Sequence, residues 1–179
     1  KAVRQTVEAA AEAGAVGFNL EDGSGDPVRP LLDIDAQCER LRAARGAAPD
    51  LVLNARTDVY LKSNLADRSR FAEAVKRANA YRKAGADCLF VPGVTDRETI
   101  RQLVKAVDGP LNVLAAAGTP PVAELQELGV ARVSIGSGAM RAALGLTRKI
   151  AKELRESGTY ESLTRDAIPY ADLNALLDR

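Results

Sequence analysis

The chain has 179 residues, with 25 Lys and Arg against 24 Asp and Glu, two Cys and no His. This length suggests a single domain, and the near-zero net charge gives no general attraction toward nucleic acid or a membrane surface. The absence of His excludes Ser-His and Cys-His catalytic pairs and His-ligated zinc, so any metal must bind oxygen ligands, which favours Mg²⁺ or Mn²⁺.

Five short apolar runs rich in β-forming residues are predicted to be strands. They are nearly continuous rather than alternating in polarity, which is typical of parallel strands that are covered on both faces. The runs are residues 16–20, 51–55, 88–91, 111–114 and 132–135.

Helical patterns lie between and around these runs, with apolar residues at intervals of three and four. The predicted helices are residues 1–13, 35–45, 66–84, 95–107, 120–128 and 138–156. Thr95 and Glu98 have the spacing of a capping box, so Thr95 is the expected N-cap residue of its helix. Pro120 and Pro121 suit the first turn of the short helix that follows them.

A glycine separates a helix from the next strand at three places, Gly14, Gly85 and Gly129. Glycine accepts the left-handed conformation that ends a helix, and the repeated joint predicts an α/β fold of serial βα units with a parallel sheet. No G-x-G-x-x-G follows the first strand, and polar residues gather where strands end, which favours a (β/α)₈ TIM barrel over a doubly wound sheet.

Five strands are too few to close a barrel of eight. The chain also begins at Lys1, inside a helical pattern and without Met. We therefore expect a single (β/α) barrel domain over residues 1–179 that is incomplete at its N-terminal side. On this interpretation the chain covers about the last five βα units and the C-terminal helices.

Charged residues at the strand ends are the candidate site. Glu21 and Asp22 end the first strand, where adjacent carboxylates favour metal or metal-bound water, or else cap the loop and remain solvated. Arg56 follows the second strand, and its planar guanidinium suits a carboxylate or phosphate. The alternative for Arg56 is a structural ion pair with Glu21 or Asp58, and Asp58 is expected to orient Arg56 or cap the loop rather than to react.

Polar residues inside the apolar strands allow two interpretations. Asn19 lies two residues before Glu21, so both side chains point to the same face, and Asn54 shares a face with Arg56 in the same way. Asn19 could bind substrate or hydrogen-bond a neighbouring strand, and the second role is favoured for Asn54 and Asn112. Residues 136–138 (Gly-Ser-Gly) could bind phosphate through backbone N–H groups or could serve only as a turn.

Four segments in order resemble the isocitrate lyase / phosphoenolpyruvate mutase superfamily. Residues 16–22 (VGFNLED) resemble its G-I-x-I-E-D strand, and residues 54–58 (NARTD) resemble its A-R-T-D strand. Residues 84–90 (AGADCLF) are similar to its A-G-A-D-x-x-F strand, and residues 128–136 (LGVARVSIG) to its L-G-V-x-R-V-S-x-G segment. These motifs span nearly the whole chain.

The resemblance implies a (β/α)₈ barrel enzyme that makes or breaks a C–C or P–C bond next to an α-keto acid or its enolate, with Mg²⁺ (or Mn²⁺) holding the oxyanion. Carried over, Glu21 would reach the metal through water, while Arg56, with Asn19 beside it, would bind a small carboxylate or phosphonate substrate. The family's main metal-binding Asp residues precede Lys1. The resemblance also implies a homodimer or homotetramer, in which the helix of residues 138–156, within a C-terminal segment of residues 138–179, packs against a neighbouring subunit.

The sequence departs from the family at the features that distinguish its branches. Asn19 stands where the lyase branch has His, and residues 23–30 contain none of the Cys, Lys and His of the lyase loop or the Lys and Asn of the mutase loop. Cleavage of isocitrate or methylisocitrate by the usual Cys is therefore not expected. Arg29 is a candidate replacement cation, and the remaining choices are an oxaloacetate- or phosphonate-directed member of the family or a further branch of it.

Two other functions are compatible with the sequence. The alternatives are a phosphate-binding barrel enzyme of another class, with its ligand at residues 136–138, and a catalytically silent oligomeric barrel. No apolar run approaches the roughly 18 residues of a membrane span, and no nucleic-acid or membrane partner is expected. Two cysteines, Cys38 and Cys88, are too few for a disulfide framework, so a cytoplasmic location is expected.

Overall fold

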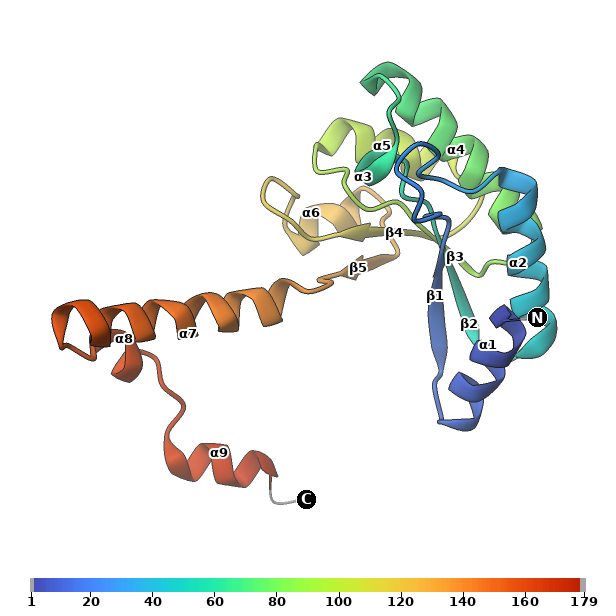
Figure 1. Ribbon diagram of the computed structural model, residues 1–179. Helices are drawn as coiled ribbons and strands as arrows, with labels where there is room; N and C mark the ends of the chain where they lie inside the picture. The colour runs from blue at the N-terminus through green and yellow to red at the C-terminus, as the bar shows by residue number, and fades with distance from the viewer. Residues whose placement is uncertain (1, 178–179) are drawn as a thin grey trace. The chain divides into compact units, whose positions relative to one another are not determined.

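A computed structural model describes residues 2–177, apart from the side chains of residues 67 and 68 (Figure 1). It contains two compact units, a first that ends at Ile135 and a second that begins at Gly136. The first unit holds the sheet and the helices that cover it, and the second consists of helices only.

The first unit is built around five parallel strands, each paired with the next along the chain. The strands are β1 (Gly17–Glu21), β2 (Val52–Arg56), β3 (Cys88–Phe90), β4 (Leu111–Leu114) and β5 (Arg132–Ser134). A doubly wound sheet reverses its strand order, whereas consecutive order is the arrangement of βα units in a barrel. The structure therefore confirms the α/β class with serial, barrel-type βα units.

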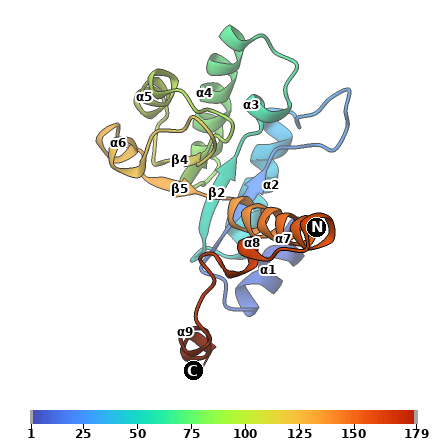
Figure 2. The ribbon, with the colours of Figure 1, turned by 90° about the vertical axis from the view of Figure 1, so that its left-hand side faces the viewer.

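Helices alternate with the strands and follow one another around the outside of the sheet (Figures 1 and 2). They are α1 (Ala2–Glu12), α2 (Ile34–Ala47), α3 (Val59–Lys62), α4 (Asp67–Lys83), α5 (Arg97–Ala106) and α6 (Val122–Glu127). The predicted helices and strands are confirmed with small shifts of their ends. The four-residue helix α3 was not predicted, because it is too short to show a hydrophobic period.

Two local predictions have different outcomes. The glycines between helices and strands are left-handed as predicted, with φ of 83° at Gly14, 106° at Gly85 and 90° at Gly129. The prediction that Thr95 caps α5 is wrong. Asp96 is the N-cap residue, and its Oδ1 accepts a hydrogen bond of 2.8 Å from the N–H of Thr99. The carboxylate satisfies the N–H at the third helical position, so the helix begins one residue later than predicted.

Strand alternation gives the sheet two different faces. One face packs against the helices and is apolar, with Leu53, Leu89 and Val113 fully buried. The opposite face, here called the polar face, holds side chains that the register places side by side across the strands. These are Asn19, Glu21, Asn54, Arg56, Cys88, Phe90 and Asn112. The helix-facing core thus fixes which side chains point to the polar face.

The second unit consists of α7 (Gly138–Ser157), α8 (Glu161–Thr164) and α9 (Tyr170–Leu177), and none of their residues is buried. Large apolar side chains are nevertheless frequent on these helices, and Met140, Leu144, Leu146 and Leu154 of α7 are all about half exposed. None of the helices in the described part of the chain combines the length and the apolar character that a bilayer crossing requires.

The close approach of β1 and β2 generates a stability prediction. A Cβ at Gly17 would lie 2.7 Å from the carbonyl oxygen of Val52, so Gly17→Ala should lower the free energy of unfolding by about 1–3 kcal/mol. The matched control is Gly46→Ala in α2, where an added Cβ meets no atom within 4 Å. That change should raise stability by roughly 0.5–1 kcal/mol through helix propensity. Urea unfolding of both variants tests this, and equal effects would contradict it.

Candidate active site

The charged side chains at the ends of β1 and β2 form an ion pair. Glu21 and Arg56 are directly opposite in the strand register, and Nη1 of Arg56 lies 3.0 Å from Oε2 of Glu21. The Arg56 side chain is 25% exposed and the Glu21 side chain 46% exposed. Both residues therefore lie at the carboxyl ends of their strands, where barrel enzymes place their active sites, and both remain accessible to a ligand.

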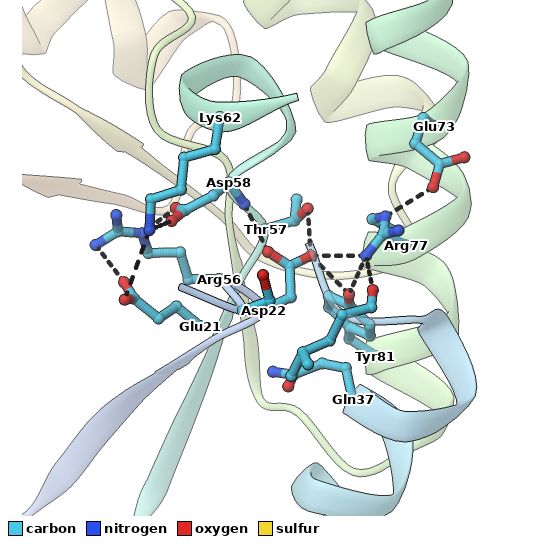
Figure 3. Close-up of polar contacts among 12 residues, drawn as sticks. Glu21, Asp22, Gln37, Arg56, Thr57, Asp58, Lys62, Glu73, Arg77 and Tyr81 are labelled. Carbon is cyan, nitrogen blue, oxygen red and sulfur yellow. Dashed lines mark hydrogen bonds and ion pairs between the residues drawn. The ribbon is translucent and has the colours of Figure 1, made fainter. Parts of the chain in front are cut away.

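Asp58 and Lys62 extend this pair into a cluster of four charges (Figure 3). Oδ1 of Asp58 lies 2.6 Å from Nε of Arg56, and Oδ2 lies 2.7 Å from Nζ of Lys62. The ammonium of Lys62 is also 4.0 Å from Oε1 of Glu21. Asp58 is fully buried, so it orients Arg56 as the sequence predicted and orients Lys62 as well.

Arg56 is held on several sides. The guanidinium carbon lies 5.8 Å from the centre of the Phe90 ring, a cation–π distance that favours a fixed orientation. Arg56 thus forms the ion pair that the sequence offered as an alternative, and it does so with both Glu21 and Asp58. These pairs leave room for ligand binding, because they are made through Nε and Nη1, the side chain is 25% exposed, and no hydrogen bond of Nη2 is found among the described residues. One edge of the planar fork is available to an anion.

Asp22 differs sharply from the neighbouring Glu21. Its carboxylate is fully buried and accepts hydrogen bonds from four groups (Figure 3). The donors are Thr57 Oγ1 (2.8 Å), the Asp58 backbone N–H (2.9 Å), Arg77 Nη1 (3.1 Å) and Tyr81 Oη (2.7 Å). The expectation of a solvated or metal-binding Asp22 is therefore wrong. Alternation along β1 turns Asp22 away from the polar face and into the core.

The network around Asp22 links three elements of the fold. Arg77 of α4 also bonds Glu73 at 2.7 Å and the carbonyl oxygen of Leu32 at 2.8 Å. Burial and the nearby Asp22 carboxylate raise the pKa of Tyr81, so its hydroxyl remains a donor to that carboxylate. Through these bonds Asp22 connects the end of β1 with α4 and with the backbone of Asp58, and it thereby positions the charge cluster.

Asparagines on the polar face hydrogen-bond across the strands. Nδ2 of Asn54 donates to Oδ1 of Asn19 at 2.7 Å, and Nδ2 of Asn112 donates to Oγ of Ser134 at 3.0 Å. The predicted structural role of Asn54 and Asn112 is confirmed. Asn19 takes part in the same bonding but is exposed, so its substrate role stays a prediction. Cys88 is buried beside Asn54, and burial raises the pKa of its thiol, in agreement with a core role.

The loop after β1 is an exposed hairpin. Its ends are joined by the N–H of Ser24, which donates to the Pro30 carbonyl at 3.0 Å, and by the N–H of Leu32, which donates to the Asp22 carbonyl at 2.8 Å. Arg29, the expected replacement cation, lies in the exposed part, and no contact joins its side chain to the charge cluster in the described residues. The second cation at the site is instead Lys62.

Sequence reasoning missed four residues of the site: Thr57, Lys62, Arg77 and Tyr81. The spacing of Asp58 and Lys62, four residues apart, is the signal that could have found Lys62, since such residues meet on a helix. Arg77 and Tyr81 have the same spacing on α4. They were missed because the apolar spacing of α4 predicts a helix face packed against the core, and this pattern does not indicate polar contacts.

No group of three Cys, Asp and Glu side chains that could hold a metal ion is found in residues 2–177, the side chains of residues 67 and 68 excepted. Glu21 is the accessible carboxylate of the cluster, and both its oxygens face cations. The expected Mg²⁺ or Mn²⁺, with Glu21 reaching it through water, therefore stays a prediction, and no chemical step below depends on it.

The glycines at residues 136–138 lie at the start of the second unit. Gly136 has a positive φ of 52°, and Ser137 precedes α7 without a side-chain capping bond. This geometry fits the turn interpretation, and phosphate binding there stays a prediction.

Three comparisons place these observations among known proteins. The family model described as phosphoenolpyruvate phosphomutase matches residues 1–155. The 2-methylisocitrate lyase of Escherichia coli is 32% identical over 90% of this chain and 56% of that enzyme. A crystal structure from Burkholderia cenocepacia, described as a candidate lyase/mutase, is 39% identical with a TM-score of 0.90 over 98% of this chain and 64% of that one.

A further solved structure with a similar fold contains a bound ligand. Oxaloacetate acetylhydrolase, solved with its product oxalate, is 26% identical with a TM-score of 0.78 over 97% of this chain and 61% of that one. The chain spans about 60% of the length of the curated relatives it matches.

The Asp22 network generates a second prediction. Asp22→Asn keeps the shape of the side chain but removes the buried charge that pairs with Arg77 and turns an amide N–H toward hydrogen-bond donors, and Glu73 is then the remaining carboxylate beside Arg77. The change should lower the free energy of unfolding by about 3–5 kcal/mol. Tyr81→Phe removes one hydroxyl donor and should cost about 1–2 kcal/mol. The control is Glu8→Gln, which breaks an exposed pair with Arg4 and should change stability by less than about 1 kcal/mol. Denaturant unfolding measures all three, and an Asp22→Asn variant as stable as the control would refute the assignment.

Proposed function

This chain belongs to the phosphoenolpyruvate phosphomutase family, within the isocitrate lyase / phosphoenolpyruvate mutase superfamily, and from that premise we propose that it forms the substrate-binding half of an α-keto acid enzyme. The reaction makes or breaks a C–C or P–C bond next to the keto group through an enolate-type intermediate. The observation that carries the proposal is Arg56 at the end of β2, oriented by Asp58 and Glu21 with part of its guanidinium open to a ligand.

The role of Arg56 follows from its geometry. Its open edge binds a substrate carboxylate or phosphonate by charge-assisted hydrogen bonds. When the bond next to the keto group breaks, the electron pair passes to the enolate oxygen, and a preoriented cation near the developing charge lowers the barrier. Asn19, exposed beside Glu21 on the polar face, is proposed to hydrogen-bond the same substrate.

The composition of the hairpin loop after β1 limits which substrates the site can be expected to act on. Residues 23–30 contain no Cys, Lys or His, so a proton cannot come from a loop thiol. Relatives of this family include an oxaloacetate decarboxylase as well as lyases and phosphomutases. We therefore favour a small α-keto dicarboxylate or phosphonocarboxylate whose reaction does not need that thiol.

The second unit supports a proposal about assembly. Helix α7 carries a row of half-exposed apolar side chains and buries none of its residues, and exposed apolar surface of this kind favours association. We propose that α7, within residues 138–179, packs against another copy of the protein in a homodimer or homotetramer.

Arg56 variants test the proposed chemistry. Arg56→Ala should lower kcat/KM for the best of oxaloacetate, phosphonopyruvate and phosphoenolpyruvate by about 10²–10⁴-fold, because a charged donor to the substrate and the developing enolate is lost. Arg56→Lys keeps the charge but loses the planar fork, and an intermediate loss is expected.

The matched control for Arg56 is Arg101→Ala, an exposed arginine of α5 that pairs with Glu98. It should leave turnover within about twofold of wild type, as expected for a surface pair. An Arg56→Ala enzyme with near-wild-type kcat/KM would exclude Arg56 from the site. Wild-type protein that turns over none of the three substrates would contradict the proposed function.

A charge on the apolar row of α7 tests the assembly. Leu144→Glu should shift the protein toward a smaller species in light scattering, because a carboxylate would be buried in the interface without a partner. Glu156→Gln, near the exposed end of the same helix, is the control and should leave the molar mass unchanged. A monomeric wild type, or a Leu144→Glu variant with unchanged mass, would contradict the proposal.

A further inference from the structure

The carboxylate of Glu21 lies near both cations of the charge cluster, Arg56 and Lys62. Oε2 of Glu21 lies 3.0 Å from Nη1 of Arg56, and Oε1 lies 4.0 Å from Nζ of Lys62. The guanidinium and the ammonium are thus close enough that one carboxylate comes within 4.0 Å of both. They are therefore also close enough to contact two anionic groups of one small molecule.

The ammonium of Lys62 is held at the site by an ion pair, although the side chain is 42% exposed. The buried Asp58 binds it at 2.7 Å, and the short helix α3 is anchored by the Lys62 N–H, which donates to the Asp58 carbonyl at 2.8 Å. Gly23 leaves the room that the ammonium occupies, because a Cβ there would lie 2.6 Å from Nζ. The end of β1 and the start of α3 together fix this cation.

Charge balance shows what Lys62 contributes. Arg56 with Glu21 and Asp58 is a group of one positive and two negative charges, which repels a second anion. Lys62 brings the cluster to neutrality, so a substrate with two negative charges can approach. The Asp58 carboxylate, which accepts from the Lys62 ammonium, raises the pKa of Lys62, so the side chain stays a cation and is unsuited to accept a proton near neutral pH.

We propose that Lys62 is a second substrate-binding cation, which contacts the second anionic group of a small dianion while Arg56 contacts the first. Lys62 thereby selects doubly charged α-keto acids over singly charged ones. This inference rests on the proposed function, and it assigns to α3 the anion-binding role that the sequence suggested for the loop residue Arg29.

Isothermal titration of the purified protein with oxalate and with pyruvate tests the assignment, since pyruvate is a singly charged α-keto acid and oxalate is a planar dianion of similar size. Wild type should bind oxalate more tightly than pyruvate. Lys62→Met should weaken oxalate binding about 10–100-fold and remove this preference, because one charged contact is lost. Lys62→Arg should keep the preference, and Lys105→Met, on the exposed face of α5, should match wild type.

A second variant perturbs the ammonium without removing it. Gly23→Ala displaces Nζ through the added Cβ, so it should weaken oxalate binding in the same direction as Lys62→Met, with a smaller effect. Arg56→Ala should weaken the binding of both ligands.

Each outcome is decisive. A Lys62→Met protein that keeps its preference for oxalate, while Arg56→Ala loses both ligands, overturns the role of Lys62 and leaves the proposed function standing. Wild type that binds neither oxalate nor pyruvate overturns both. Equal weakening of oxalate and pyruvate by Lys62→Met overturns the charge selection, because Lys62 would then act on any anion.

Discussion

The carboxylate of Asp22 accepts four hydrogen bonds at a place that is fully buried, and the geometry of the site depends on it. A buried charge is tolerated only where its partners are complete, so Thr57, Arg77 and Tyr81 are held in place by the same requirement that holds Asp22. The fourth donor is the backbone of Asp58, whose side chain orients both cations. The position of the exposed charge cluster therefore depends on the buried carboxylate of Asp22.

Adjacent acids have opposite roles because a strand alternates its faces. Glu21 points to the polar face and shares it with Arg56, whereas Asp22 points to the helices and meets α4. The same alternation places Asn54 opposite Asn19 and leaves Leu53 and Ala55 for the core. One register thus produces a hydrophobic core on one side and a charged, ligand-accessible surface on the other.

The charges of Glu21, Arg56, Asp58 and Lys62 sum to zero. Both cations contact the buried carboxylate of Asp58, which fixes their positions. Such preorganisation suits a site that must bind an anion and stabilise further negative charge, because the cations need not be repositioned during the reaction. Among the described residues the cations come from β2 and α3, so the loop after β1 need not supply one. The proposed anion site therefore does not require the residues by which the loop departs from the lyase and mutase patterns.

The amino-acid sequence by itself determined the order and type of the main elements, since apolar periods and the glycines at helix ends are local signals. It also determined that Glu21 and Arg56 end neighbouring strands, and its motifs identified the family. Tertiary structure alone decided that Asp22 is buried, that Asp58 serves two cations and that Lys62 completes the cluster. Those outcomes depend on which distant side chains meet, as when Tyr81 of α4 reaches Asp22 of the loop after β1. Contacts of this kind arise from packing between elements, and no local pattern of residues encodes them.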